Sequence, residues 1–152
     1  MLRILSTFAL TAALAVPIAA QANTVSFSDL GTTGCGPTLV GSFYTIGQGN
    51  GLFIELTVTT EQVAPPVMLF ISASPIVPGL PIDGIFGQNY GCVLNLNPVF
   101  SQAHQALGNT YVWNRSLGGW WGTAYVQFAE VFLDGGLEVK TTNLLEVTRP
   151  FM

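Results

Sequence analysis

The stretch GLFIELTVTTE, residues 51–61, decides the fold class. Within it Leu52, Ile54, Leu56 and Val58 alternate with the side chains of residues 53, 55, 57 and 59. Successive side chains of a β-strand point to opposite faces of the sheet, so a period of two indicates a strand. This stretch is therefore predicted to be a half-buried β-strand.

Similar patterns recur on both sides of this stretch. Further strands are predicted at residues 67–73, 92–97, 110–117, 123–133, 137–140 and 144–148. Turns rich in Gly or Pro are expected at 31–37, 47–51, 75–81, 118–119 and, with the hairpin signal Asp-Gly-Gly, at 134–136. Only residues 99–107 have the pattern of a short helix. Short strands separated by turns predict an all-β fold, a single antiparallel β-sandwich.

The first 22 residues have the pattern of a cleavable signal peptide. A positive start at Arg3 precedes an apolar run over residues 4–16, and the small-x-small site Ala20-Gln21-Ala22 follows. The apolar run is shorter than the roughly 20 residues that a membrane-spanning helix needs. We therefore expect removal of residues 1–22 after Ala22, a β-sandwich domain over 23–152 without a membrane span, and secretion to the extracellular space or the periplasm.

Charged residues are scarce, at 8% of the 152 residues. Removal of Arg3 with the signal peptide leaves three cationic and eight acidic side chains, a net charge of −5. Binding to a phosphate backbone needs a stripe of Lys and Arg, so nucleic acid is not expected as a partner. Two cysteines and one histidine are too few for a closed zinc site, and no calcium-loop motif is present. No metal or cofactor is therefore expected.

Cys35 and Cys92 are the only cysteines. In an oxidising compartment an even number of cysteines indicates disulfide bonding. The bond would close a loop of about 58 residues. By the chain-entropy account it would contribute about 4 kcal/mol to stability. We therefore predict a Cys35–Cys92 disulfide.

Several short strings resemble a known kind of module: GCG at 34–36, LFISAS at 69–74, LPID at 80–83, GCVL at 91–94, AYVQ at 124–127, Asp134 and TNLLEVT at 142–148. With them, about 115 residues resemble a secreted bacterial module that is common in planctomycete and myxobacterial extracellular proteins. The resemblance implies an Ig-like β-sandwich, and it implies no activity, cofactor or catalytic residue. That module usually has a Ser-Asn-Gly-like turn before its last strand, where this chain has Thr142-Asn143-Leu144.

Candidate catalytic groups are few. His104 is the only histidine, a Gly-x-Ser-x-Gly motif is absent, and an exposed loop position is the simpler reading of His104. Glu130 lies in a nearly all-apolar predicted strand, so we expect it either to lie at the edge of a sheet or to have a bonding partner. Asp83 is expected to cap backbone N–H groups in a turn. A small hydrolase would need His104, or a pair such as Glu130 and Asp83, to converge in a cleft. We expect no catalytic residue and no enzyme activity.

Aromatic residues gather within 15 positions that include Tyr111, Trp113, Trp120, Trp121 and Tyr125. If Trp120 and Trp121 are neighbours in a strand, they point to opposite faces, and one of them faces away from the core. An exposed indole stacks on sugar rings or is buried against a protein partner. The alternative is that the core and a loop cover both. The candidate ligand contacts are Tyr111, Trp113, Trp120 and Trp121, and the candidate partners are a polysaccharide or another surface protein.

The sequence thus predicts a secreted, non-catalytic β-sandwich module with an extracellular binding or structural role. Carbohydrate binding through an exposed Trp is the first alternative. A small hydrolase and a small outer-membrane β-barrel are further alternatives. Strands that span a membrane need about 9–11 residues, a length that only two segments of this chain reach.

Overall fold

The computed structural model describes residues 24–31, 35–46, 51–133 and 136–151. Over these ranges the chain forms eleven β-strands and one single-turn helix, and every strand pair is antiparallel. This confirms the predicted all-β class. The predicted signal peptide, residues 1–22, lies outside the described residues. Nowhere in the described ranges is a helix long and apolar enough to cross a membrane.

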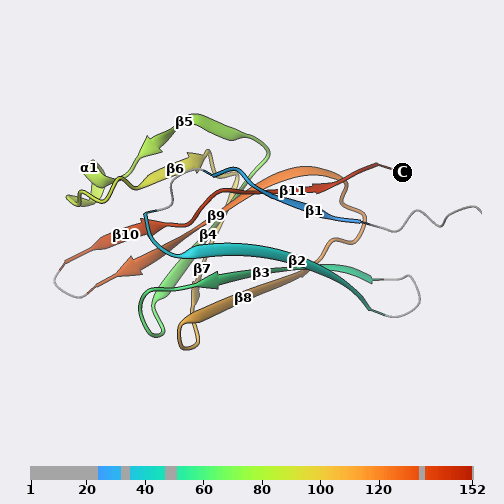
Figure 1. The fold of residues 1–152 in the computed structure, drawn as a ribbon, viewed down its shortest axis with the longest axis horizontal. Helices are drawn as coiled ribbons and strands as arrows, with labels where there is room; N and C mark the ends of the chain where they lie inside the picture. Colours follow the sequence, from blue (N-terminus) through green and yellow to red (C-terminus); the bar gives the residue numbers. More distant parts are fainter. Residues whose placement is uncertain (1–23, 32–34, 47–50, 134–135, 152) are drawn as a thin grey trace, which may run out of the picture.

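The largest sheet, sheet A, has six strands in the order β1-β11-β9-β4-β7, with β10 also paired to β9 (Figure 1). Its strands are β1 (Ser26–Asp29), β4 (Pro66–Ser72), β7 (Phe100–Gln105), β9 (Gly122–Phe132), β10 (Glu138–Thr141) and β11 (Leu145–Arg149). Strand β9 is central because its 11 residues reach β11 along one half and β10 along the other. Its opposite edge pairs with β4.

Sheet B has three strands in the order β2-β3-β8: β2 (Thr38–Ile46), β3 (Gly51–Thr59) and β8 (Thr110–Ser116). The stretch quoted first forms β3, and the predicted apolar face of this strand is buried. That face packs against sheet A in one hydrophobic cluster that includes Leu56 of β3, Leu69 of β4 and Phe128 of β9. Figure 1 shows sheet B along one side of sheet A.

The opposite face of sheet A is covered by β5 (Pro75–Pro81), α1 (Asp83–Phe86) and β6 (Val93–Leu96), which we call the cover. Strands β5 and β6 form a separate two-stranded sheet. The cover packs on sheet A through a second cluster of Ile82, Cys92, Ala129 and Val139. Because neighbouring side chains of β9 point to opposite faces, Phe128 faces sheet B and Ala129 faces the cover. Residues 126–130 of β9 are therefore buried on both faces of the strand.

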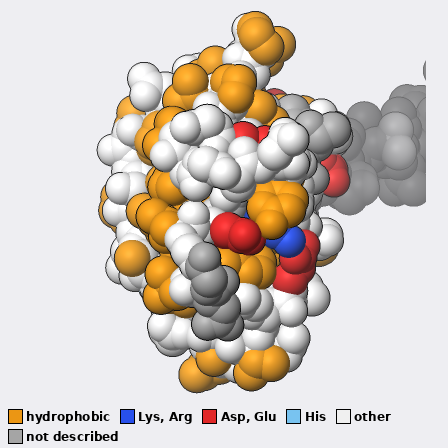
Figure 2. All heavy atoms as spheres, turned by 90° about the vertical axis from the view of Figure 1, so that its left-hand side faces the viewer, with side chains coloured by type: hydrophobic (Ala, Val, Ile, Leu, Met, Phe, Trp, Pro, Cys, Tyr) orange, Lys and Arg blue, Asp and Glu red, His pale blue; other side chains and the backbone are white. Residues whose placement is uncertain are grey.

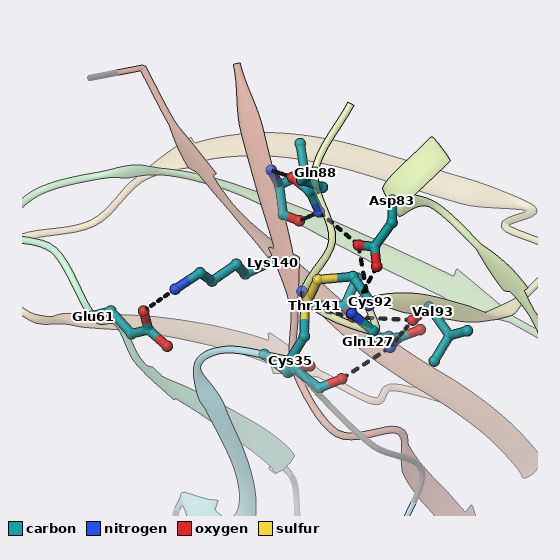
Figure 3. The surroundings of a disulfide bond; sticks show 12 residues. Cys35, Glu61, Asp83, Gln88, Cys92, Val93, Gln127, Lys140 and Thr141 are labelled. Atoms are coloured by element: carbon teal, nitrogen blue, oxygen red, sulfur yellow. Dashed lines mark hydrogen bonds and ion pairs between the residues drawn. A yellow bond between two sulfur atoms is a disulfide. The ribbon is translucent and has the colours of Figure 1, made fainter. Parts of the chain in front are cut away.

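The disulfide between Cys35 and Cys92 is formed, with a Cα–Cα distance of 5.0 Å, as the sequence predicted. It joins the segment before β2 to the start of the cover strand β6 (Figure 3). The Cys35 N–H donates to the carbonyl of Thr141 at 3.1 Å, so the disulfide also lies against β10. Disulfides form and persist in oxidising compartments, and this bond is typical of a protein from such a compartment.

All seven predicted strands are present, as β3, β4, β6, β8, β9, β10 and β11. Two local predictions were wrong. The expected helix at 99–107 is the strand β7, because its backbone pairs with β4 along its length. The expected turn at 75–81 is β5, whose prolines are tolerated because this strand pairs only with β6 and with a register shift. Strands β1 and β2 were not predicted.

Candidate functional site

The predicted ligand-contact residues Tyr111, Trp113, Trp120 and Trp121 are all half-buried. Tyr111 and Trp113 lie in β8 and pack against the core between the sheets. Trp120 and Trp121 lie before β9, which begins at Gly122, so the expected alternation of strand neighbours does not apply to them. The position of each ring is set by the loop between β8 and β9.

Trp113 and Trp120 line one open cleft of about 390 Å³ between sheets A and B, which we call the tryptophan cleft. Arg115 and Ser116 of β8 also line it. The same two indoles line an inner hollow of about 170 Å³ that reaches the core residue Val126. The structure therefore brings two of the three tryptophans together, with a guanidinium and a hydroxyl beside them.

Trp121 is held apart from this cleft by Arg149 of β11. The Arg149 guanidinium carbon lies 3.8 Å from the centre of the Trp121 ring, and Phe151 stacks on the same indole at 6.4 Å. The Nη1 atom of Arg149 donates to the carbonyls of Gly118 and Trp120, each at 3.0 Å. Arg149 thus fixes the loop that presents Trp120. The sequence contained no signal for this role, because Arg149 is distant along the chain.

The structure does not bring Glu130 and Asp83 together. Glu130 of β9 is fully buried, and its side chain leaves the strand on the face that carries Phe128, toward sheet B. Its carboxylate accepts hydrogen bonds of 2.9 Å from the backbone N–H groups of Glu61 and Gln62. Asp83 begins α1 in the cover, on the other side of sheet A. The sequence predicted that Glu130 is either at an edge or paired. The structure shows that it is paired, with two backbone N–H groups as its partners.

Asp83 caps the loop that follows α1 (Figure 3). One of its carboxylate oxygens accepts from the Gln88 amide and the Cys92 N–H, each at 3.2 Å, and the other accepts from the Gly91 N–H at 2.6 Å. Desolvation by itself would raise the pKa of Asp83, but the hydrogen bonds from Gln88 and the backbone outweigh it and hold this pKa below 3.8. Asp83 therefore acts as a backbone cap, as the sequence predicted.

His104 lies in β7 and is half-buried, not in the exposed loop that the sequence favoured. Its ring stacks on Tyr111 at 4.8 Å, and its Nε2 atom is buried without a hydrogen-bond partner among the described residues. Burial lowers the pKa of His104 below 6.5, and the positive charge of Arg115 lowers it further. In the described part of the chain, no group of three or more His, Cys, Asp or Glu side chains could hold a metal ion.

A second hollow, of about 360 Å³, lies between sheet A and the cover. We call it the apolar pocket. Its floor is formed by Met68 and Phe70 of β4 together with Ala129 and Val131 of β9. Its roof is formed by side chains of the cover: Leu80, Ile82, Ile85, Phe86 and Leu94.

Sequence reasoning missed this pocket, although β9 contained a signal for it. A strand that is apolar on both faces is covered on both sides, so the nearly all-apolar run 124–132 pointed to a second layer. Ala129 is the smallest side chain on that face, and it leaves room beneath the larger roof residues. The cover itself was hidden because its strand β5 has the composition of a turn.

No protein-family model matches this chain, and no curated protein or solved structure matches it significantly. The resemblance to the planctomycete and myxobacterial module, with its Ig-like topology, stays a prediction.

Proposed function

We propose that this chain is a secreted, non-catalytic β-sandwich module that binds a saccharide at the tryptophan cleft. The observation that carries the proposal is the convergence of Trp113 and Trp120 on one open cleft. A β-sandwich is supported by the single hydrophobic cluster that sheets A and B share. Secretion is supported by the Cys35–Cys92 disulfide and by the signal-peptide pattern of residues 1–22.

The composition of the tryptophan cleft fits a sugar ring. Indole rings are flat and apolar, and they can cover the C–H face of a pyranose, as ligand sites commonly combine apolar walls with a few polar groups. Arg115 provides fixed N–H donors and Ser116 a hydroxyl that both donates and accepts. The cleft opens to solvent, so a long polysaccharide could place one residue there while the rest of the chain extends away.

A non-catalytic role is supported by the bonding of the candidate acid and base groups. The carboxylates of Glu130 and Asp83 are occupied by backbone N–H groups and lie on opposite sides of sheet A. His104 stacks on Tyr111 inside the fold. A hydrolase needs such groups around a shared cleft, and here each one stabilises a different part of the structure.

Tryptophan fluorescence titration against a panel of soluble polysaccharides tests this function. We expect at least one polysaccharide to give a saturable change in fluorescence. Trp120→Ala should weaken the affinity for this polysaccharide about tenfold or more. Trp121→Ala is the matched control, because this indole is stacked on Arg149 and Phe151 and does not line the cleft. A panel without any response, or an equal loss in both variants, would overturn the proposal.

A further inference from the structure

We propose that the apolar pocket between sheet A and the cover is a second binding site, which takes one small, uncharged, apolar molecule. The pocket lies on the face of β9 that carries Ala129, whereas the tryptophan cleft lies between sheets A and B. The two sites therefore share no lining residue, and this proposal does not depend on saccharide binding. It gives the cover a function that the core of the fold does not require.

The pocket is held open by bonds at the edges of its roof. Protein interiors are close-packed, and a hollow of about 360 Å³ closes unless the layers around it are fixed. The disulfide holds the start of β6, and the Gln88 side chain exchanges two hydrogen bonds with the backbone of Val139 in β10. On the floor side, the Gln127 amide donates to the Val93 carbonyl at 3.0 Å. The roof is thus attached to sheet A by these hydrogen bonds and, through the disulfide, to the segment before β2.

The lining determines the class of ligand. Among the described residues no charged side chain lines the pocket, and the one hydroxyl, of Thr141, is bonded to the Val93 carbonyl at 3.0 Å. Lys140 lies between two lining residues of β10, so its side chain leaves the strand on the opposite face, where it pairs with Glu61 at 2.5 Å. A charged ligand would lose its hydration without a partner in the pocket. The ligand is therefore uncharged and mainly hydrocarbon.

The size of the pocket limits the ligand further. Its volume is about twice the ~150 Å³ of an apolar cavity that binds benzene, and it lies near the lower end of the ~300–1,000 Å³ range of ligand pockets. A molecule with up to three aromatic rings, or a short hydrocarbon chain, fits this space. Larger lipids with several chains do not.

The mouth of the pocket is apolar as well. Ile85 of α1 is 66% exposed and Leu137, next to β10, is 50% exposed, and both belong to the lining. Figure 2 shows hydrophobic side chains across this end of the molecule, with acidic groups and a cation beside them. Exposed apolar residues that rim a hollow are typical of ligand-binding grooves, and here they form the entrance of the apolar pocket.

Two fluorescent probes of nearly equal shape test the proposal: neutral N-phenyl-1-naphthylamine and the anionic 1-anilinonaphthalene-8-sulfonate. We expect saturable binding of one neutral probe per chain, at least tenfold tighter than binding of the sulfonate. Ile85→Glu adds a charge at the mouth and should weaken binding of the neutral probe about tenfold. Val99→Glu is the matched control, since Val99 is 76% exposed and lines neither hollow. It should leave binding unchanged.

The proposal would be overturned if no saturable binding is found, if both probes bind with equal affinity, or if Ile85→Glu has no effect. If near-ultraviolet circular dichroism shows that Ile85→Glu is not folded, Leu137→Glu replaces it in the same comparison. Sedimentation at the probe concentrations separates a small-molecule site from contact between two copies. Binding that appears only in a dimer would overturn the proposal. Unchanged probe binding by Trp120→Ala distinguishes this site from the saccharide site.

Discussion

Glu130 and Gln62, which lie 68 positions apart in the sequence, are joined by a hydrogen bond of 2.9 Å from the Gln62 N–H to Oε1 of the carboxylate. The Glu61 N–H donates to Oε2 of the same carboxylate, also at 2.9 Å. An acidic side chain in a buried part of β9 thus has its hydrogen-bonding needs met by backbone groups of the turn that follows β3. The pairing connects that turn of sheet B to the central strand of sheet A.

Replacement of Glu130 by Gln should therefore destabilise the fold. The amide keeps one acceptor oxygen, but it places an NH₂ donor against the second backbone N–H. We expect a loss of about 1–3 kcal/mol in the free energy of unfolding, the usual cost of an unsatisfied buried group. Urea denaturation measures this loss. Glu55→Gln on the outer face of β3 is the control and should change stability by less than about 0.5 kcal/mol; equal losses in the two variants would refute the explanation.

Gln127 holds the cover to sheet A, and its substitution should also lower the free energy of unfolding. It is fully buried, its Oε1 accepts from the Asn95 N–H at 2.8 Å, and its Nε2 donates to the carbonyls of Val93 and Thr142. Gln127→Met keeps the volume and removes all three bonds, so we expect a loss of about 3 kcal/mol in unfolding free energy. Thermal and urea unfolding measure it.

The matched control for Gln127 is Gln102, whose Oε1 is buried without a hydrogen-bond partner among the described residues. Gln102→Met removes no satisfied acceptor, so its stability should stay the same or rise slightly. If Gln102→Met is as destabilising as Gln127→Met, the loss reflects side-chain repacking and not the hydrogen bonds of Gln127.

The predicted strands share a cause: their local pattern agreed with their tertiary environment. Strand β3 was predicted because one buried face produces a period of two, and β9 because β-branched and aromatic residues dominate it. Strand β7 has the sequence FSQAHQ, which has no strand pattern of its own, and its conformation is set by pairing with β4. Such pairing between distant segments is not visible in a local pattern.

The candidate sites were predictable only in part, for a similar reason. The disulfide was predictable because the chain has only two cysteines. The capping role of Asp83 was predictable because its neighbours have the composition of a turn. The separation of Trp120 from Trp121 depends on Arg149, which reaches the loop from β11. The apolar pocket depends on the register that places Ala129 beneath the cover. Both features arise from contacts between distant elements.

Loss of the disulfide should lower both thermal stability and probe binding. A loop of this length corresponds to about 4 kcal/mol, and for a domain of this size each kcal/mol shifts the melting temperature by about 2–4 °C. We therefore expect reduction, or the double variant Cys35→Ser with Cys92→Ser, to lower the melting temperature by roughly 8–16 °C. Differential scanning calorimetry measures this change.

Binding of the neutral probe shows whether the roof of the apolar pocket loses its position after reduction of the disulfide. Because Cys92 anchors one edge of the roof, affinity for the neutral probe should fall at temperatures where the reduced protein is still folded. Saccharide binding at the tryptophan cleft should be unaffected under the same conditions. An unchanged melting temperature after verified reduction would contradict the stabilising role of the disulfide, and unchanged probe affinity would contradict its role in the roof.

His104 should make stability depend on pH in a defined direction. Its folded-state pKa lies below the ordinary value of 6.5, first because of burial and then because of the charge of Arg115, so below about 6.5 the unfolded chain binds more protons at this site. The free energy of unfolding should therefore decrease as the pH falls from 7 through 6.5 toward the folded pKa. His104→Phe keeps a ring against Tyr111 but does not titrate, and it should flatten this decrease. Urea denaturation of both proteins at pH 7 and pH 5.5 measures the difference; the same decrease in both would show that another group causes it.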